Sequence, residues 1–355
     1  MNTLNELGWN AHFESLYRTF SNETWEPARI SFVERTQYGA LTVHGERRAI
    51  LSGKRQHFDR KSIVVGDWVL VSPMNDDTVY IHHVLERKTL ISRAFMKKDW
   101  AYSSGLERQE IAANIDHIFI VVAADHDFSV RRIERYLACA SQSRAQPIIL
   151  LNKIDQIDQA RPLIEALQHA ALDTPVIPLS VLTGEGLERL SDYLKETIAI
   201  VGSSGVGKSS LINALCGREI QTYGSIRSRD GKGRHTTTRR DLIVLGGGGI
   251  LIDNPGIREI QVWAEENDIQ NVFSDIETLA LQCPYRDCTH TKEPGCAVQK
   301  AVNEGHLESE RLRNFRRLLE EANRVESHNR KDFAKKEARV RKQRIDQHLR
   351  MKGKR

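Results

Sequence analysis

The sequence predicts an α/β protein with a nucleotide-binding domain at residues 110–275, an OB-like β-barrel at 26–95 and a helical metal-binding domain at 276–329. Three observations support this prediction. Short β-rich runs separated by turn residues fill residues 26–95. In residues 110–275, apolar strands alternate with helical segments around a phosphate-binding motif. A Cys/His cluster lies in residues 276–329.

The composition fits a soluble chain of two or three domains. The 355 residues are 40% hydrophobic and 28% charged. No apolar run reaches the roughly 18 residues of a membrane span, and the N-terminus lacks the regions of a secretory signal. The cysteines number five, and three of them fall within fourteen residues, which favours a reducing compartment and a metal over disulfides. We expect a cytoplasmic monomer without a membrane partner.

The amino-terminal region begins with an extension, residues 1–25, in which Ala11–Phe20 fits a short helix. The β-rich runs that follow are typical of a small barrel. Cationic side chains crowd one expected connecting region, at Arg47, Arg48, Lys54, Arg55, Arg60 and Lys61. Such a surface suits RNA phosphates, although a solvated basic loop would have the same composition. Residues 96–109 are polar and irregular, as in a linker.

The pattern of a parallel sheet starts after residue 110. We expect apolar strands at 115–123, 147–151 and 175–179, and helices at Val130–Ser143, Ala160–Ala171 and Gly184–Lys195. Strands that are apolar throughout, with helices between them, indicate a parallel sheet covered on both faces.

The phosphate-binding motif follows a further apolar strand. It comprises Gly202, Ser203, Ser204, Gly205, Val206, Gly207, Lys208 and Ser209, with Ser210 continuing into a helix. Its glycines let backbone N–H groups approach phosphate oxygens, and the helix N-terminus adds partial positive charge. Lys208 can reach the β- and γ-phosphates, and the Ser209 hydroxyl suits Mg²⁺.

A base-reading segment precedes this motif. Asn152-Lys153-Ile154-Asp155 follows an apolar strand, where α/β sheets place ligand contacts. The Asp155 carboxylate can accept both guanine N1–H and N2–H₂, a pair that adenine lacks, and the Lys153 stem can lie along the base. The next strand leads to Ser180, whose loop can contact the base through its backbone. The pattern favours GTP over the alternative, ATP.

Candidate switch segments come after the phosphate-binding motif. Residues 222–239 are rich in Gly, Ser, Thr and Arg and can order around a γ-phosphate and Mg²⁺. Thr237 is a candidate Mg²⁺ ligand within them. A hairpin then ends in Asp253, which can hold a Mg²⁺-bound water, and Gly256, whose N–H can sense the γ-phosphate. Because the base-reading segments come first, the order is that of a circularly permuted P-loop GTPase domain.

The Cys/His cluster predicts a structural zinc site. Cys283, Cys288, His290 and Cys296 offer three thiolates and one imidazole. Four such ligands satisfy tetrahedral Zn²⁺, one per chain, and leave no open position for catalysis.

Taken together, these residues resemble the small ribosomal subunit-dependent GTPases, the family known in bacteria as RsgA. The resemblance covers nearly the whole chain and rests on the permuted motif order combined with the downstream Cys/His cluster. It implies a cytoplasmic GTPase that acts late in small-subunit assembly, with hydrolysis stimulated by that subunit and its release coupled to GTP turnover. The implied partners are the small subunit with its rRNA, and GTP or GDP; zinc is implied too. A GTP-gated rRNA-binding module with little turnover is the alternative.

Catalysis requires in-line attack of water on the GTP γ-phosphate, with Lys208 and the loop amides stabilising the developing charge. Ras-like enzymes carry Gln directly after the glycine that matches Gly256, but this chain has Ile257. Because an apolar side chain cannot orient water, we expect slow turnover until His235 or the ribosome completes the site. The alternative for His235 is an exposed or RNA-facing role.

The net charge of +5 is distributed unevenly. Residues 330–355 hold twelve Lys/Arg against three Asp/Glu, a net charge of +9, so the rest of the chain carries about −4. We expect this tail to dock onto rRNA through its phosphates, with a merely solubilising tail as the alternative.

Overall fold

The computed structural model describes residues 3–20, 24–34, 37–52, 63–99, 103–217, 241–253 and 265–324, without the side chains of 94–99, 103–108 and 241. The chain forms two compact units. One joins Met1–Ser92 to Glu110–Ile260, and the other joins Arg93–Gln109 to Gln261–Arg355. Among the described residues, no helix combines the length and the apolar character needed to cross a bilayer.

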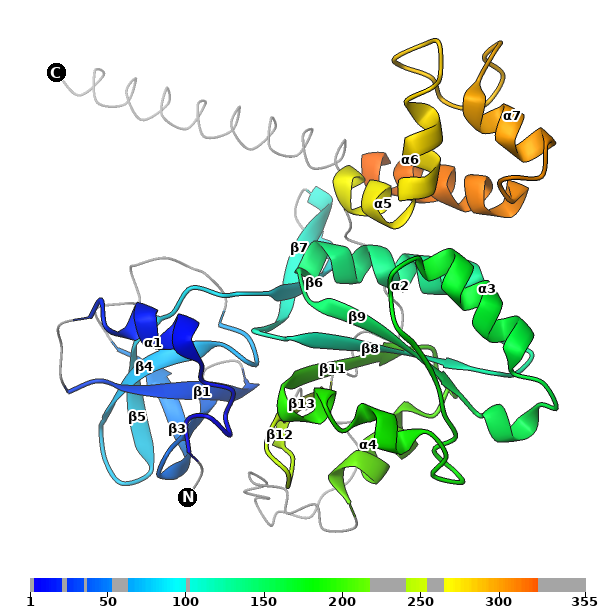
Figure 1. The fold of residues 1–355 in the computed structure, drawn as a ribbon. Helices are drawn as coiled ribbons and strands as arrows, with labels where there is room; N and C mark the ends of the chain where they lie inside the picture. Colours follow the sequence, from blue (N-terminus) through cyan, green and yellow to red (C-terminus); the bar gives the residue numbers. More distant parts are fainter. Residues whose placement is uncertain are drawn as a thin grey trace, which may run out of the picture. The chain divides into compact units, whose positions relative to one another are not determined.

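The first unit begins with a closed barrel in the strand order β1-β2-β3-β5-β4 (Figure 1). Its strands are β1 (Glu26–Val33), β2 (Tyr38–Thr42), β3 (Gly45–Leu51), β4 (Trp68–Pro73) and β5 (Thr78–Val84). Apolar residues of all five strands, among them Ile30, Val69 and Ile81, fill its interior. Helix α1 (Ala11–Tyr17) precedes the barrel, and the Asn10 side chain accepts a hydrogen bond from the His12 N–H at the start of that helix.

The barrel corrects one expectation. Arg47 and Arg48 lie on strand β3 and not in a connecting loop, because Gly45 lets the chain turn directly from β2 into β3 with φ of +114°. The other four cationic residues of that group fall outside the described residues.

The second part of this unit is a six-stranded sheet in the order β10-β9-β8-β11-β13-β12. From one edge to the other, the strands are β10 (Val176–Pro178), β9 (Gln146–Asn152), β8 (His117–Ala123), β11 (Thr197–Gly202), β13 (Ile250–Asp253) and β12 (Asp241–Val244). All neighbours are parallel except the β12–β13 hairpin, and every residue of β8 and β11 is buried. The parallel sheet expected from apolar strands is confirmed.

Helices cover both faces of the sheet. Helices α2 (Val130–Ser143) and α3 (Arg161–Ala171) lie on one face, and α4 (Lys208–Cys216) lies on the other (Figure 1). The expected helix at Gly184–Lys195 is wrong, since the segment forms only the 3-10 turns η3 (Leu187–Leu190) and η4 (Tyr193–Lys195). Gly184 and Gly186 both adopt positive φ, which prevents an α-helix from starting there.

The expected linker at 96–109 is also corrected. Strands β6 (Leu90–Asp99) and β7 (Ser103–Ala113) pair into a two-stranded sheet that spans it. Two strands can pair through their facing N–H and C=O groups whatever their side chains, so a polar composition does not exclude strands.

A buried arginine connects the barrel to the sheet. Arg29 of β1 is 0% exposed, and its Nη1 donates to the Leu7 carbonyl (2.5 Å) and to Thr197 Oγ1 (3.0 Å) at the start of β11. Its Nη2 donates to the Asn114 carbonyl at 2.8 Å. Burial lowers the pKa of Arg29 to about 10, which still leaves it cationic at neutral pH.

The second unit is built from helices α5 (Glu266–Val272), α6 (Ser274–Ala280) and α7 (Ala297–Asn303) and a helix at 309–324. Arg311 is 4% exposed, donates through Nε and Nη2 to both carboxylate oxygens of Asp275, and lies over the Phe273 ring. This partly buried ion pair ties the helix at 309–324 to α6.

Candidate nucleotide-binding site and metal centre

The phosphate-binding motif forms a loop between β11 and α4, as its spacing predicts. Gly205 and Gly207 adopt φ of +83° and +100°, which side chains rarely allow. A Cβ at Gly202 would collide with the Val121 carbonyl, and one at Gly207 would collide with Asn152 Nδ2. The loop therefore needs glycine both for its backbone shape and for its close contact with the neighbouring strands.

The polar residues of the loop lie at the N-terminus of α4. Lys208 Nζ donates to the Gly202 carbonyl at 2.7 Å and also to the Ser203 carbonyl. Ser209 and Ser210 are exposed in the first turn of this helix. The arrangement provides a cation, two hydroxyl groups and the N–H groups of the first turn of α4, which together suit a phosphate chain.

Asn152 connects the phosphate-binding loop to the base-reading segments. It is buried at the end of β9, and its Nδ2 donates to the Val206 carbonyl at 2.8 Å. Its Oδ1 accepts the Val181 N–H at 3.1 Å. One side chain thus bridges two loops that are separate in the sequence and holds them together at the end of β9.

Lys153 and Asp155 follow this asparagine. The Ser180 hydroxyl donates to Asp155 Oδ1 at 2.5 Å, which orients the carboxylate expected to read guanine. Lys153 has φ of +65°, and its Nζ donates to Asp125 Oδ2 at 2.9 Å. That hydrogen bond holds the pKa of Asp125 below its ordinary value. The residues predicted to read the base, Asp155 and Ser180, are thus in contact, and Ile154 lies between Lys153 and Asp155 in the same turn.

The carboxyl edge of the sheet also holds Asp253. This residue ends β13, which pairs with β11 in parallel, and it is exposed. The Asp253 carboxylate and burial together raise the pKa of the Cys216 thiol on α4, with burial the larger cause. Thr237, His235 and Gly256, the other candidate switch residues, lie outside the described residues.

Three residues of the β8–α2 region contact the site without having been predicted from the sequence, namely Asp125, Arg132 and Tyr136, and Asp127 pairs with Arg132. Asp125 contacts Lys153, while Arg132 Nη1 donates to Ser203 Oγ at 2.7 Å. The only sequence signal available was the four-residue spacing of Arg132 and Tyr136, which places both on one face of a helix.

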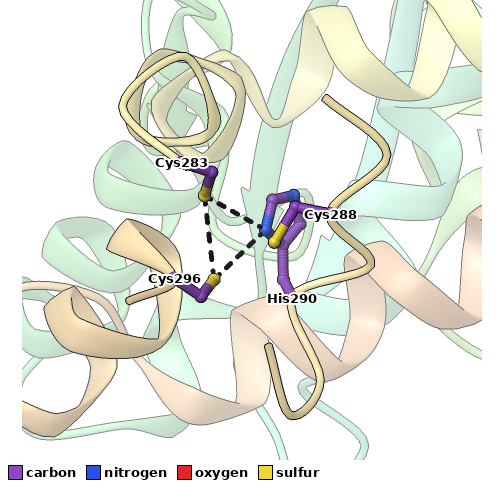
Figure 2. A group of neighbouring side chains, drawn as sticks. All are labelled: Cys283, Cys288, His290 and Cys296. Carbon is purple, nitrogen blue, oxygen red and sulfur yellow. Dashed lines mark hydrogen bonds between the residues drawn. The ribbon is translucent and has the colours of Figure 1, made fainter. Parts of the chain in front are cut away.

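The Cys/His cluster of the second unit is confirmed as a group that can hold a metal ion. One ligand atom from each of Cys283, Cys288, His290 and Cys296 lies within 4.8 Å of the others. Figure 2 shows the four side chains pointing toward a common centre. Cys283 Sγ lies 3.7 Å from both Cys296 Sγ and His290 Nδ1, and the last two atoms are 3.4 Å apart.

The loop between the ligands is held by its own hydrogen bonds. His290 has φ of +56°, and its carbonyl accepts from Gln299 Nε2 at 2.5 Å. Cys296 caps α7, where its Sγ accepts the Gln299 N–H. Glu293 accepts the N–H groups of Thr289 and Thr291 at 2.9 and 2.8 Å. These contacts preorganise the ligands before any metal binds.

Comparison with known proteins places the chain in a family. Residues 84–263 match the family model of the RsgA GTPase. A protein from Methanosarcina acetivorans named small ribosomal subunit biogenesis GTPase RsgA is 43% identical, over 90% of this chain and 85% of the relative. The chain belongs to the RsgA GTPase family. A relative of the same name from Opitutus terrae is 37% identical, over 90% of this chain and 89% of its own length.

Solved structures agree with the RsgA fold. YjeQ from Thermotoga maritima is 26% identical, with a TM-score of 0.64 over 84% of this chain and 98% of that protein. YloQ, described as a circularly permuted GTPase, is 24% identical, with a TM-score of 0.60 over 85% of this chain and 96% of its own. The permuted GTPase fold predicted from motif order and the barrel predicted from the β-rich runs are therefore confirmed.

Proposed function

We propose that this RsgA family member hydrolyses GTP to GDP and phosphate, binds the small ribosomal subunit and assists its late maturation. The observation that carries the proposal is the Asn152 bridge, because it joins a phosphate-binding loop to a base-reading segment in one site. The names of the relatives, small ribosomal subunit biogenesis GTPase, support the choice of partner. The inferred ribosomal partner also favours a cytoplasmic location, and we expect the protein to act as a monomer.

The chemistry rests on binding and electrostatics. Lys208 and the N–H groups of the loop and of α4 would hold the β- and γ-phosphates and stabilise charge that develops during water attack. Mg²⁺ bound with GTP would neutralise the same oxygens, with Ser209 and Thr237 as its protein ligands and Asp253 holding one of its waters. The exposed Ser209, next to Lys208, fits that role. The Gly256 N–H would sense the γ-phosphate.

The sequence position that orients the attacking water in Ras-like enzymes holds an apolar residue in this chain. Ile257 stands where a water-orienting glutamine would be expected, so the free protein should turn over slowly. We assign His235 to this role, completed by the small subunit. A GTP-gated rRNA-binding module with little turnover is the second candidate, and the same Ile257 favours it.

Single-turnover GTP hydrolysis with small subunits, large subunits or neither separates these candidates. We expect stimulation by small subunits alone, and loss of that stimulation in His235→Ala. If hydrolysis stays equally slow in all three mixtures while GTP still promotes subunit binding, the chain is a binding module and the enzymatic proposal is wrong.

Guanine selection is assigned to Asp155, oriented by Ser180. Exchange of Asp155 for Asn should turn an acceptor of guanine N1–H into a partner for xanthine, which carries an oxygen in place of the exocyclic amine. We expect the variant to lose GTP binding and to gain binding of xanthosine triphosphate, since mispaired polar groups discriminate by about 10⁴-fold. Unchanged GTP affinity would contradict the assignment.

We infer that the metal of the second unit is Zn²⁺, held by Cys283, Cys288, His290 and Cys296. Tetrahedral zinc with Zn–S near 2.3 Å and Zn–N near 2.0–2.1 Å would separate its ligand atoms by roughly 3.5–3.8 Å. The separations of 3.4–3.7 Å among the ligand atoms of Cys283, His290 and Cys296 fit that requirement, and the Cys288 Sγ lies within 4.8 Å of all three. With all four positions filled by protein, the zinc would stabilise the fold and take no part in hydrolysis.

Contacts with rRNA are assigned to the basic tail at 330–355, with a further contribution from the barrel. Of the basic group on the barrel, Arg48 is exposed and Arg47 is half-buried on β3. Phosphate attraction of this kind has no base specificity, so binding should weaken steeply with salt.

A further inference from the structure

The β8–α2 region contacts both halves of the proposed nucleotide site. The loop at 124–129 follows β8, and α2 begins directly after it. Asp125 of this loop accepts from Lys153 in the base-reading segment. Arg132 in the first turns of α2 donates to Ser203 in the phosphate-binding loop, 71 residues later in the chain.

Ser203 is held from two directions. Arg132 Nη1 lies 2.7 Å from its hydroxyl oxygen. The buried Tyr136 hydroxyl, one helical turn further along α2, also hydrogen-bonds to the Ser203 side chain. The Ser203 carbonyl is meanwhile an acceptor for Lys208 Nζ. The side chain and the backbone of this one residue therefore couple α2 to the lysine that would bind phosphate.

The arginine is itself fixed in place. Asp127 accepts from both terminal nitrogens of Arg132, at 2.5 and 3.0 Å, in the two-pronged geometry that restricts a guanidinium most strongly. That pairing lowers the pKa of Asp127, so the carboxylate is ionised at neutral pH. A small hollow lies beside this contact, and its walls include Val122, Ala123, Phe128, Ser129 and Val206.

We propose that Arg132, with Tyr136 and Asp125, forms a clamp that positions Ser203 and Lys153 and thereby slows the release of guanine nucleotide. These are positioning residues, because they act through groups that would touch the nucleotide. A loop already ordered in its binding shape loses less conformational entropy when the phosphates arrive, which raises affinity mainly through a slower dissociation rate. The inference rests on the proposed function, since it concerns the same nucleotide site.

The experiment measures dissociation of a fluorescent GDP analogue from the full-length protein by stopped flow. Arg132→Met should speed dissociation about tenfold, the effect expected for one lost charge-assisted hydrogen bond. Tyr136→Phe removes only a hydroxyl and should speed dissociation by several-fold, as should Asp125→Asn. Arg132→Lys keeps one donor but cannot pair with both Asp127 oxygens, so it should fall between Arg132→Met and the parent.

A double-mutant cycle with Ser203→Ala tests the route of the effect. Once the Ser203 hydroxyl is gone, Arg132→Met should add little to the dissociation rate. Arg161→Met is the matched control, because Arg161 pairs with Glu165 on the exposed surface of α3 in the same unit. It should leave dissociation unchanged. Melting temperatures of all variants, measured in parallel, distinguish a positioning effect from loss of fold.

The outcomes separate this inference from the function on which it rests. If the parent protein does not bind the GDP analogue, the proposed function is wrong. If the parent binds it but Arg132→Met and Tyr136→Phe release it at the parental rate, the clamp is overturned. Additive effects of Arg132→Met and Ser203→Ala would overturn it as well. If Arg132→Met does not fold, the Tyr136→Phe and Ser203→Ala variants decide.

Discussion

Replacement of Arg29 by methionine should break the connection between the barrel and the sheet. Methionine can follow the course of the arginine stem but offers no donor. The carbonyls of Leu7 and Asn114 and the Thr197 hydroxyl would then lose their partner in the interior. These acceptors belong to the amino-terminal segment, the segment before β8 and the first residue of β11. The substitution therefore affects three junctions at once.

The size of the effect follows from two opposing terms. Each buried acceptor left without a donor costs about 1–3 kcal/mol, so three of them cost roughly 3–9 kcal/mol. Against this, methionine removes the free-energy cost of burying a charge. That burial lowers the pKa of Arg29 to about 10, and the shift corresponds to roughly 3 kcal/mol. We expect a net loss of about 3 kcal/mol in the free energy of unfolding, within the range for a broken buried network.

Urea denaturation followed by circular dichroism and tryptophan fluorescence measures this loss. Arg18→Met is the matched control, because Arg18 pairs with Glu14 on the surface with its side chain 77% exposed. It should change stability by less than about 0.5 kcal/mol. If Arg29→Met costs less than about 1 kcal/mol, or no more than the control, the buried arginine does not hold the barrel to the sheet.

Three further predictions concern the nucleotide loop, the metal and the tail. Gly207→Ala should weaken binding of a GDP analogue at least ~100-fold with an unchanged circular dichroism spectrum, because its Cβ would collide with the asparagine amide that bridges the site. Gly246→Ala, where a Cβ would meet open space, should bind normally. Cys296→Ser should lose about one equivalent of zinc per chain by elemental analysis, whereas Cys139→Ser, outside the cluster, should keep it. Deletion of residues 330–355 should weaken binding to small subunits in sedimentation assays and flatten its salt dependence; unchanged values would leave the tail with a solubilising role.

The parts of the site that could be predicted are those whose residues are neighbours in the sequence. The phosphate-binding loop is specified by its glycines, because its backbone adopts positive φ at Gly205 and Gly207, which other residues rarely allow. The metal cluster is likewise local, since all its ligands fall between Cys283 and Cys296. In both cases the spacing alone limits the geometry, so the sequence is sufficient.

The parts that could not be predicted depend on contacts between distant segments. Arg132 and Ser203 form a pair only because α2 packs beside the phosphate-binding loop, and neither residue has an unusual sequence context. Arg29 gave no signal either, because an arginine within a β-rich run is normally expected to face solvent. The polar strands β6 and β7 were missed for a related reason. Apolar periodicity in a sequence indicates strands with a buried face, whereas a two-stranded ribbon can form from strands without that periodicity.

The geometry of the sheet explains why circular permutation of the GTPase domain leaves the site intact. Gly202, Asn152 and Asp253 end three strands at the same carboxyl edge, and they are brought together by strand pairing and by the bonds of Asn152. None of these contacts requires one segment to precede another in the chain. The amino end of β11 meanwhile holds Arg29 through Thr197. A single buried strand thus carries the phosphate-binding loop at one end and the barrel anchor at the other, and neither connection depends on the order of segments in the chain.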